Sequence, residues 1–471
     1  MQANLSIDSP APFSFSAALP EHAWLTGSAC APYLTDVMQH SGAALAVALP
    51  ESTAHLSELA RSAFAHGVRL IPQGERTGLV GAAVPDRSGK QCVVSLARMN
   101  RVRDFDPLNR SITVDAGMRL SDLNRHAAAA GLCLPLDLGS NPSVGGLIGS
   151  NAGGSRLLKY GDVRRNVLGL EAVLADRDGT VLDMLAPLRK NNTGLDLKQI
   201  FIGAGGAHGV VSAVSFALAP VERSTLAIFI AFHTYADAAL ALQHFEDTFG
   251  EMLSAYEFIS ASALARVRQT FPALSTPFDN TGAACFALVE IASAMTGLDT
   301  LFETRALEVL ETLGHDGGVI DAALGASERF WRIRDSLPLA VVHDALPLSF
   351  DVSFARGTLV PFLEDTGRWL AAAHAPLQCY EFGHFGDGGC HLIIAIPHAL
   401  AGAYGPMRQI GLRSELYERV RKFGGSFSAE HGIGPSNLAY YRKLVPEGVR
   451  TTARAIQDAL DPAHLMGRFR Y

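Results

Sequence analysis

The chain has 471 residues, of which 48% are hydrophobic and 18% charged, and its formal net charge is −7 at pH 7. This length and composition predict two or three domains, each with a hydrophobic core of its own. The net negative charge, without a dense run of Lys or Arg, argues against a nucleic-acid partner, and no apolar window is long enough to predict a transmembrane segment.

Short strand-like and helix-like segments alternate between residues 42 and 220, where Gly is frequent. Apolar and β-branched runs predict strands, and longer amphipathic runs predict helices. We expect strands at 44–49, 68–72, 91–96 and 112–114, and helices at 53–66 and 120–131. The pattern predicts an α+β domain over residues 42–220, preceded by an N-terminal extension over 1–41.

Three Gly-rich segments of this domain, residues 72–81, 135–146 and 150–162, predict a nucleotide cradle. Backbone N–H groups approach phosphates closely where glycines remove the side chains. None of the segments is a G-x-G-x-x-G fingerprint or a Walker A loop. Each alone is typical of a turn, but their succession favours a cofactor site, because every glycine adds backbone entropy that folding must overcome.

The Gly clusters thin out after residue 220, and helix-like and strand-like segments alternate again. We expect helices at 235–249, 298–313 and 359–373, and strands at 226–232 and 284–291. A second α+β unit of this size is typical of a domain that caps a substrate site. We therefore predict a cap domain over residues 221–430.

Two short segments, 383–391 and 428–434, concentrate three histidines and one glutamate among glycines. His384 and His391 lie seven residues apart around a Gly-Asp-Gly turn, so both imidazoles converge if the turn folds back. Glu430 then supplies an anionic third ligand for a divalent metal. Two histidines and one carboxylate with open positions are typical of a catalytic metal site.

The six cysteines contain no C-x-x-C pair, which predicts reduced thiols in a core rather than disulfides or a thiolate zinc site. Cys390 immediately precedes His391, but on a strand it would point to the opposite face. The N-terminal residues show no signal-peptide pattern. We expect a cytoplasmic protein, with peripheral attachment at the inner membrane as the alternative.

In this order, the motifs resemble those of the vanillyl-alcohol oxidase and p-cresol methylhydroxylase flavoprotein superfamily. The resemblance is to its D-2-hydroxyacid dehydrogenases, including D-2-hydroxyglutarate and D-lactate/glycolate dehydrogenases, and it covers residues 72–85, 135–162, 188–206, 383–391 and 428–434. It implies an α+β fold: a two-part FAD-binding domain of the p-cresol methylhydroxylase (PCMH) type, and an α+β cap domain with an antiparallel sheet. It also implies that residues 431–471 return to the FAD domain and that FAD is held non-covalently.

The resemblance further implies which residues contact FAD. The pyrophosphate-binding loop would include Pro72, Gly74, Thr77, Gly78 and Leu79. The other expected flavin contacts are Pro135, Asp137, Ser140, Gly145, Gly146, Asn151, Gly153, Tyr160 and Val210.

For chemistry, the resemblance implies a divalent metal, read as zinc, on His384, His391 and Glu430. A D-2-hydroxyacid would chelate this metal, so that both histidines also belong to the substrate site. His431 would act as general base for the substrate hydroxyl while the C2 hydride passes to flavin N5. The substrate carboxylate needs a bidentate cation, for which Arg334 is the candidate and Arg332 the competitor.

Departures from the family bear mainly on the substrate. Pro338 and Ser349 stand where D-2-hydroxyglutarate enzymes carry a Thr and a Lys for the distal carboxylate, so a monocarboxylate, D-lactate-like or apolar, is expected. D-2-hydroxyglutarate dehydrogenase remains an alternative, as do a flavin oxidase, a flavin-binding subunit of a glycolate-oxidase-like respiratory complex, a paralogue that has lost turnover and, more remotely, a zinc hydrolase. We expect an electron-transfer flavoprotein, a quinone or a cytochrome as acceptor, and a homodimer.

Other departures fall near the cofactor and the metal. They are Glu75 and Arg76 in the phosphate loop, Gly205 in place of a Glu, Gly389 in place of an Asn, and residues 465–468 in place of Asn-Pro-Gly-Lys. Glu75 would repel a pyrophosphate unless a cation compensates it, and Arg76 is the expected compensating residue.

Overall fold

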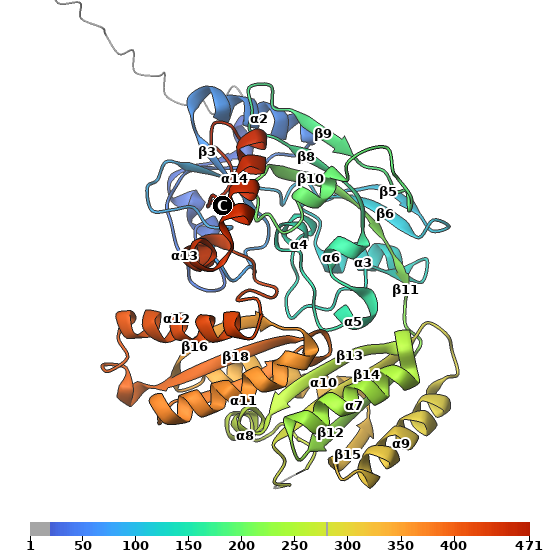
Figure 1. The fold of residues 1–471 in the computed structure, drawn as a ribbon. Coiled ribbons are helices and arrows are strands. Elements are labelled where there is room, and N and C mark those ends of the chain that lie inside the picture. The colour runs from blue at the N-terminus through green and yellow to red at the C-terminus, as the bar shows by residue number, and fades with distance from the viewer. Residues whose placement is uncertain (1–18, 279–280) are drawn as a thin grey trace, which may run out of the picture.

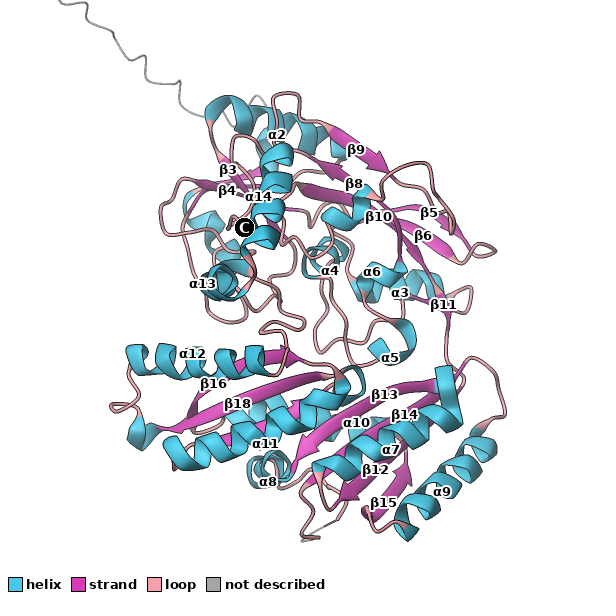
Figure 2. Ribbon diagram, viewed as in Figure 1, coloured by secondary structure: helices cyan, strands magenta, loops and turns pink. Residues whose placement is uncertain are grey.

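The computed structural model describes residues 19–278 and 281–471. Figure 1 shows two bodies, one containing the N-terminal part of the chain together with its C-terminus, and the other containing the middle of the chain. Figure 2 shows that both mix helices and strands. The predicted α+β class is therefore confirmed.

The first sheet has the order β1-β2-β4-β3. Its strands are β1 (Trp24–Leu25), β2 (Ala44–Ala48), β3 (Arg69–Gln73) and β4 (Gln91–Ser95); β2, β4 and β3 run parallel and β1 is antiparallel. Helix α2 (Thr53–His66) has the predicted bounds, because Ser52 caps its first turn and Gly67 ends it with a left-handed backbone. Part of the predicted N-terminal extension, η1 (Glu21–Ala23), β1 and η2 (Gly27–Tyr33), lies along this sheet; residues 1–18 lie outside the described part.

The second sheet is antiparallel, with the order β5-β6-β10-β8-β9. Its strands are β5 (Val102–Asp106), β6 (Ser111–Asp115), β8 (Val167–Val173), β9 (Val181–Met184) and β10 (Val210–Ala217). Helices α3 (Leu120–Ala128), α4 (Val144–Ser150), α5 (Leu157–Tyr160) and α6 (Val163–Asn166) connect β6 to β8, with η3 (Leu197–Ile200) before β10. The short strands β7 (Leu132–Cys133) and β11 (Ala219–Pro220) pair with each other.

The third sheet forms the cap domain and is antiparallel throughout, in the order β15-β12-β14-β13-β17-β18-β16. Its strands are β12 (Ser224–Phe232), β13 (Leu253–Ser260), β14 (Cys285–Ser293), β15 (Val319–Gly325), β16 (Ala345–Ser353), β17 (Gln378–Gly383) and β18 (Gly389–Pro397). The predicted antiparallel cap sheet is thus present.

Helices cover both faces of the cap sheet and bury its side chains in two cores. On one face pack α7 (Tyr235–Phe249), α9 (Asp299–His315), α11 (Arg356–Ala373) and α12 (Pro406–Lys422). On the other face pack α8 (Ala261–Thr270) and α10 (Ser327–Val342). Helix α7 has the predicted bounds, because Thr234 and Asp237 form a capping box at its start. Short 3₁₀ turns, η4 (Gly250–Met252), η5 (Phe385–Asp387) and η6 (His398–Leu400), join strands and helices.

After the cap domain the chain crosses back to the first body, as Figure 1 shows in red. This segment contains α13 (Gly434–Leu444) and α14 (Glu447–Leu460). The Leu70 N–H of β3 donates to the Leu465 carbonyl (2.7 Å), and the Gly467 N–H donates to the Leu70 carbonyl (2.9 Å). Residues 465–467 therefore extend the first sheet, next to the predicted phosphate loop. Within residues 19–278 and 281–471, no helix combines the length and apolarity needed to cross a membrane.

Candidate active site

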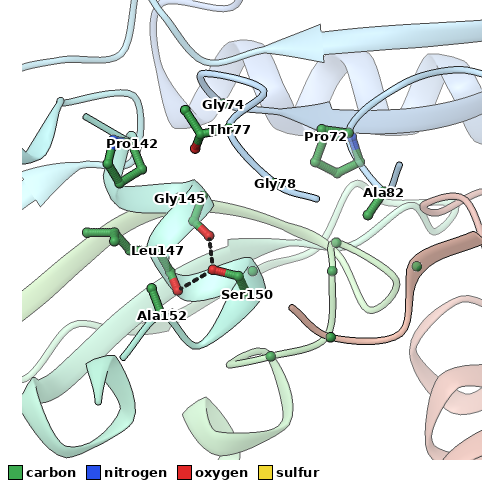
Figure 3. A pocket seen from close by; sticks show the side chains of 18 of the residues that line it. Pro72, Gly74, Thr77, Gly78, Ala82, Pro142, Gly145, Leu147, Ser150 and Ala152 are labelled. Atoms are coloured by element: carbon green, nitrogen blue, oxygen red, sulfur yellow. Dashed lines mark hydrogen bonds between the residues drawn. The ribbon is translucent and has the colours of Figure 1, made fainter. Parts of the chain in front are cut away.

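A cavity of about 300 Å³ opens in the first body, beside loop 74–78 and helix α4, which face each other across it in Figure 3. Most of the residues predicted to contact FAD line it: Pro72, Gly74, Thr77, Gly78, Leu79, Ser140, Gly145, Gly146, Gly153 and Val210. Three Gly-rich segments that are separate in sequence thus meet around one space, as their succession predicted.

Glycine is required at Gly74 by the close approach of helix α4. A Cβ there would lie 2.2 Å from the Ser143 hydroxyl oxygen. That hydroxyl caps α4 by accepting the Gly146 N–H at 3.3 Å. A side chain at residue 74 would therefore displace the Ser143 hydroxyl from its capping position, so glycine allows the loop to approach the helix N-terminus closely.

Four predicted FAD contacts do not line the cavity. Pro135 is buried, and the Asp137 carboxylate lies 3.8 Å from the Arg156 guanidinium. The Asn151 side chain donates to Asp162 (2.7 Å). The Tyr160 hydroxyl donates to Glu222 (2.7 Å) at the start of the cap domain. In this structure the side chains of Asp137, Asn151 and Tyr160 support loops and the contact between the two bodies.

Residues that the sequence analysis did not predict also line the cavity, among them Ser150, His208 and Phe469. Phe469 explains the departure at Gly205, since a Cβ at Gly205 would lie 3.0 Å from its ring. In the phosphate loop, Glu75 accepts a hydrogen bond from Arg119 (3.0 Å). The compensating cation is thus Arg119, whereas Arg76 contacts Gln73 and lies over the Tyr33 ring.

The predicted metal ligands come together at the edge of the cap domain that faces this cavity. His384 follows β17, His391 lies on β18, and Glu430 lies in the loop between α12 and α13. One candidate ligand atom from each of the three lies within 4.8 Å of the others, and His384 Nε2 is 3.6 Å from Glu430 Oε1. The turn between the two histidines folds back as expected, with Gly388 at φ 86° against the Phe354 carbonyl.

Arg334 reaches this cluster from helix α10 through a carboxylate that the sequence analysis missed. The Arg334 Nε–H donates to Glu257 Oε2 (2.7 Å), and His384 Nδ1 is hydrogen-bonded to Glu257 Oε1 (2.7 Å). An Arg334 Nη atom lies 3.4 Å from His384 Nε2. The competitor Arg332 is exposed and pairs with Glu328, so Arg334 is the arginine that belongs to the site.

Burial and charge set the protonation of this group. Burial alone would raise the pKa of Glu257, but His384 and Arg334 outweigh it and lower that pKa to about 2. Burial opposes a charged His384, yet the Glu257 carboxylate raises its pKa to about 9. Burial and the neighbouring His384 lower the pKa of His391 to about 4. The Glu257 carboxylate thus stabilises positive charge on the His384 ring, whether a proton or a metal ion supplies it, and burial favours the neutral form of His391.

A second carboxylate, Asp351 on β16, supports the other half of the cluster. Its Oδ2 accepts the backbone N–H groups of Glu430 (2.8 Å) and His431 (2.9 Å). His391 Nδ1 and His431 Nδ1 lie 3.8 and 3.7 Å from its two oxygens. Burial opposes its ionisation, but His431, His391 and the two N–H groups lower the pKa of Asp351. Asp351 therefore fixes the loop that carries Glu430 and His431.

The cluster and the cavity share this loop, because Glu430, His431, Gly432, Ile433 and Gly434 also line the cavity. The Gly154 N–H, from the third Gly-rich segment, donates to Glu430 Oε1 (3.4 Å). Cys390 is buried on the opposite face of its strand, as alternation predicted. The candidate metal-ligating side chains therefore lie directly beside the cavity.

Comparison with known proteins decides the family. A family model described as "FAD binding domain" matches residues 44–185, and one described as "FAD linked oxidases, C-terminal domain" matches residues 221–469. The chain is a member of the FAD-linked oxidase family. The mitochondrial D-2-hydroxyglutarate dehydrogenase of Arabidopsis thaliana is 33% identical over 442 residues, covering 93% of this chain and 76% of that protein. The D-2-hydroxyglutarate dehydrogenase of Stutzerimonas stutzeri (strain A1501) is 31% identical over 432 residues, covering 89% of each.

Solved structures confirm the fold of this FAD-linked oxidase. Substrate-bound p-cresol methylhydroxylase superposes with a TM-score of 0.71 at 16% identity, covering 95% of this chain and 93% of that one. An alkyldihydroxyacetonephosphate synthase gives a TM-score of 0.69 at 16% identity, covering 95% and 83%. These structures confirm the predicted PCMH-type fold, and the matching FAD-binding family model supports the predicted FAD.

Proposed function

We propose that the protein oxidises a D-2-hydroxy monocarboxylate to the 2-oxoacid, using FAD and one divalent metal ion, with zinc as the first candidate. This oxidation of a CH–OH donor is the reaction for which its D-2-hydroxyglutarate dehydrogenase relatives are named. The observation that carries the proposal is the convergence of His384, His391, Glu430 and Arg334 beside the FAD cavity.

The donor set fits a metal ion. Two ligands about 2.1 Å from a tetrahedral zinc lie roughly 3.4 Å apart, which is close to the 3.6 Å between His384 Nε2 and Glu430 Oε1. Asp351, His391 and His431 also lie within metal-binding range of one another. Asp351 suits a ligand role less well, because its Oδ2 already accepts two backbone N–H groups.

The side chains of this site would have separate roles in the proposed reaction. Arg334 has one N–H bonded to Glu257 and further N–H groups facing His384, where they can bind the substrate carboxylate. His431 lines the cofactor cavity and would take the hydroxyl proton. When bound, the metal lowers the pKa of the substrate hydroxyl and FAD accepts the hydride from C2.

The surroundings of Ser349 favour a monocarboxylate. Ser349 and Asp351 point to the same face of β16, and Ser349 pairs in register with Ile393. Pro338 lies one helical turn beyond Arg334. The Arg413 guanidinium at this strand donates to the Ser349 carbonyl (2.8 Å) and lies over the Phe350 ring, which points to the opposite face. Neither Pro338 nor Ser349 has a side chain that could pair with a second substrate carboxylate, which supports a monocarboxylate.

The names of the relatives favour D-2-hydroxyglutarate as a second candidate. Anaerobic bleaching of the flavin absorbance by D- and L-lactate, D-2-hydroxyisovalerate and D-2-hydroxyglutarate separates the two. We expect bleaching by the D-monocarboxylates and its loss with a chelator. Preference for D-2-hydroxyglutarate would contradict the monocarboxylate assignment, and bleaching unaffected by the chelator would contradict the metal. The acceptor, the homodimer and the cytoplasmic location remain predictions.

A further inference from the structure

We infer that Glu257 is a positioning residue that couples the metal ligand His384 to the substrate-binding Arg334. The inference rests on the proposed function, because it assigns a role to a residue behind the proposed metal and carboxylate sites. Glu257 contacts neither the cofactor cavity nor the metal-binding nitrogen; its oxygens hold the two side chains that would make those contacts.

The position of Glu257 in the fold is unusual for a charge. It lies in the middle of β13, a strand whose residues are all buried, and it is 1% exposed. By strand alternation Glu257 lies on the face of the sheet that helix α10 covers. Ile259 of the same strand lies on that face too and packs against the apolar side of α10. Burying a carboxylate in such a core is costly unless it is paired and hydrogen-bonded.

Each Glu257 oxygen has its own hydrogen-bond partner. Oε1 is hydrogen-bonded to His384 Nδ1 and Oε2 accepts from Arg334 Nε, both at 2.7 Å. With Nδ1 held by the carboxylate, His384 Nε2 is the nitrogen directed to Glu430 Oε1. A carboxylate on the far nitrogen of a ligating histidine fixes the tautomer and the ring orientation.

One planar carboxylate, that of Glu257, holds both the Arg334 guanidinium and the His384 ring. It therefore fixes the position of these two side chains relative to each other. Arg334 must place its remaining N–H groups where a chelated hydroxyacid presents its carboxylate. His384 must place Nε2 on the metal that holds the same hydroxyacid. Loss of the Glu257 charge should therefore weaken metal binding and carboxylate binding together.

The decisive variant is Glu257→Gln, whose amide oxygen can accept from His384 or from Arg334 but whose NH₂ group repels the other donor. We expect a 10- to 100-fold loss of zinc affinity, on the order measured for supporting residues of metal sites, and a rise in KM for D-lactate. Zinc affinity is measured by competition with a chromogenic chelator on FAD-loaded protein, so that readout does not depend on turnover.

Two further variants distinguish the loss of this positioning role from a general loss of stability. Arg334→Gln should raise KM for D-lactate and leave zinc affinity within about threefold of the parent, because Glu257 still holds His384. Glu171→Gln removes another buried carboxylate, paired with Arg103 (3.0 Å) in the FAD domain, and should leave both quantities unchanged. If Glu257→Gln does not fold, Glu257→Asp replaces it, with both quantities expected to shift in the same direction.

Parent-like zinc affinity in a folded, flavin-loaded Glu257 variant would overturn the inference, as would a change in only one of the two quantities. Parent protein that binds no zinc would instead overturn the proposed function and, with it, this role for Glu257.

Discussion

The cofactor cavity of the first domain is built around Gly-rich segments, whereas the cluster in the cap domain consists of ionisable side chains held by other side chains. The cavity takes its shape from Gly-rich segments at 72–81, 135–146 and 150–162, each continuous in sequence. The cluster draws on α10, β13, β16, β18 and the loop after α12. The shape of the cavity depends on the absence of side chains at its glycines. The cluster depends on the particular functional groups of its side chains.

The comparison predicts different responses to mutation. In the cluster, single side-chain changes should abolish chemistry while leaving FAD in place. In the cavity, only changes that add atoms between closely packed segments should matter, and they should act on cofactor affinity.

Glu430→Ala should have the largest effect, since Glu430 is the only anionic ligand of the proposed set and also accepts the Gly154 N–H. We expect loss of bound metal and a fall of about 10³-fold or more in the rate of flavin reduction, because metal stabilisation supplies several kcal/mol. Metal analysis and anaerobic stopped-flow absorbance measure both. A variant that keeps its metal would contradict the ligand assignment.

His431→Gln should retain both metal and FAD, because the His431 side chain is outside the proposed ligand set. We expect flavin reduction to slow by about 10²- to 10⁴-fold, the range associated with removal of a general base. Reduction at the parental rate would remove His431 from the proton transfer.

Asp351→Asn tests the carboxylate that supports Glu430 and His431 through their backbone N–H groups. We expect turnover to fall about 10- to 100-fold with flavin content unchanged. Asp365→Asn is the matched control, because Asp365 is a cap-domain carboxylate that pairs with Arg419 away from the cluster. Equal effects of the two substitutions would indicate a general loss of stability instead.

Gly74→Ala tests the Gly-rich segments that shape the cavity. The added Cβ would meet the Ser143 hydroxyl at 2.2 Å and disturb the cap of α4, at a cost of about 1 kcal/mol. We expect FAD affinity to fall roughly five- to tenfold, as measured by fluorescence titration of apoprotein. Gly139→Ala should bind FAD normally, because a Cβ at Gly139 would have no atom within 4 Å. Unchanged affinity in Gly74→Ala would show that this contact is not needed for the cradle.

Glu171→Gln should change stability alone. Burial opposes ionisation of Glu171, but hydrogen bonds from Ser212 and Thr53 and the charge of Arg103 lower its pKa. A lowered pKa stabilises the folded protein above the unfolded value of about 4.3, and this contribution is lost as the pH falls through the folded pKa. The difference in unfolding midpoint between parent and variant should therefore be largest at pH 7 and shrink below about pH 4. A difference independent of pH would contradict it.

Sequence reasoning predicted the parts of the molecule whose signals are local. Helices α2 and α7 have the predicted bounds because their caps lie next to them in sequence. The metal candidates share two short motifs, and the glycines of the cavity lie in continuous runs. These features depend on neighbours within a few residues, which a sequence shows directly.

The features that sequence reasoning missed depend on distant partners. Glu257 and Asp351 stand in apolar strands, and a charge there is the signal that could have drawn attention to them. Their partners come from 77 and 80 residues away, in Arg334 and His431. Similarly, Arg119 rather than the adjacent Arg76 neutralises Glu75, because fold topology and not proximity in sequence brings the charges together.

The central claim is that the cap-domain cluster carries the chemistry and the neighbouring cavity holds the cofactor. The most direct test is to titrate zinc into chelator-treated, FAD-loaded protein while following anaerobic flavin reduction by D-lactate. We predict that reduction is absent without zinc and reaches its maximum at one zinc per chain. Full-rate reduction without metal would contradict the account.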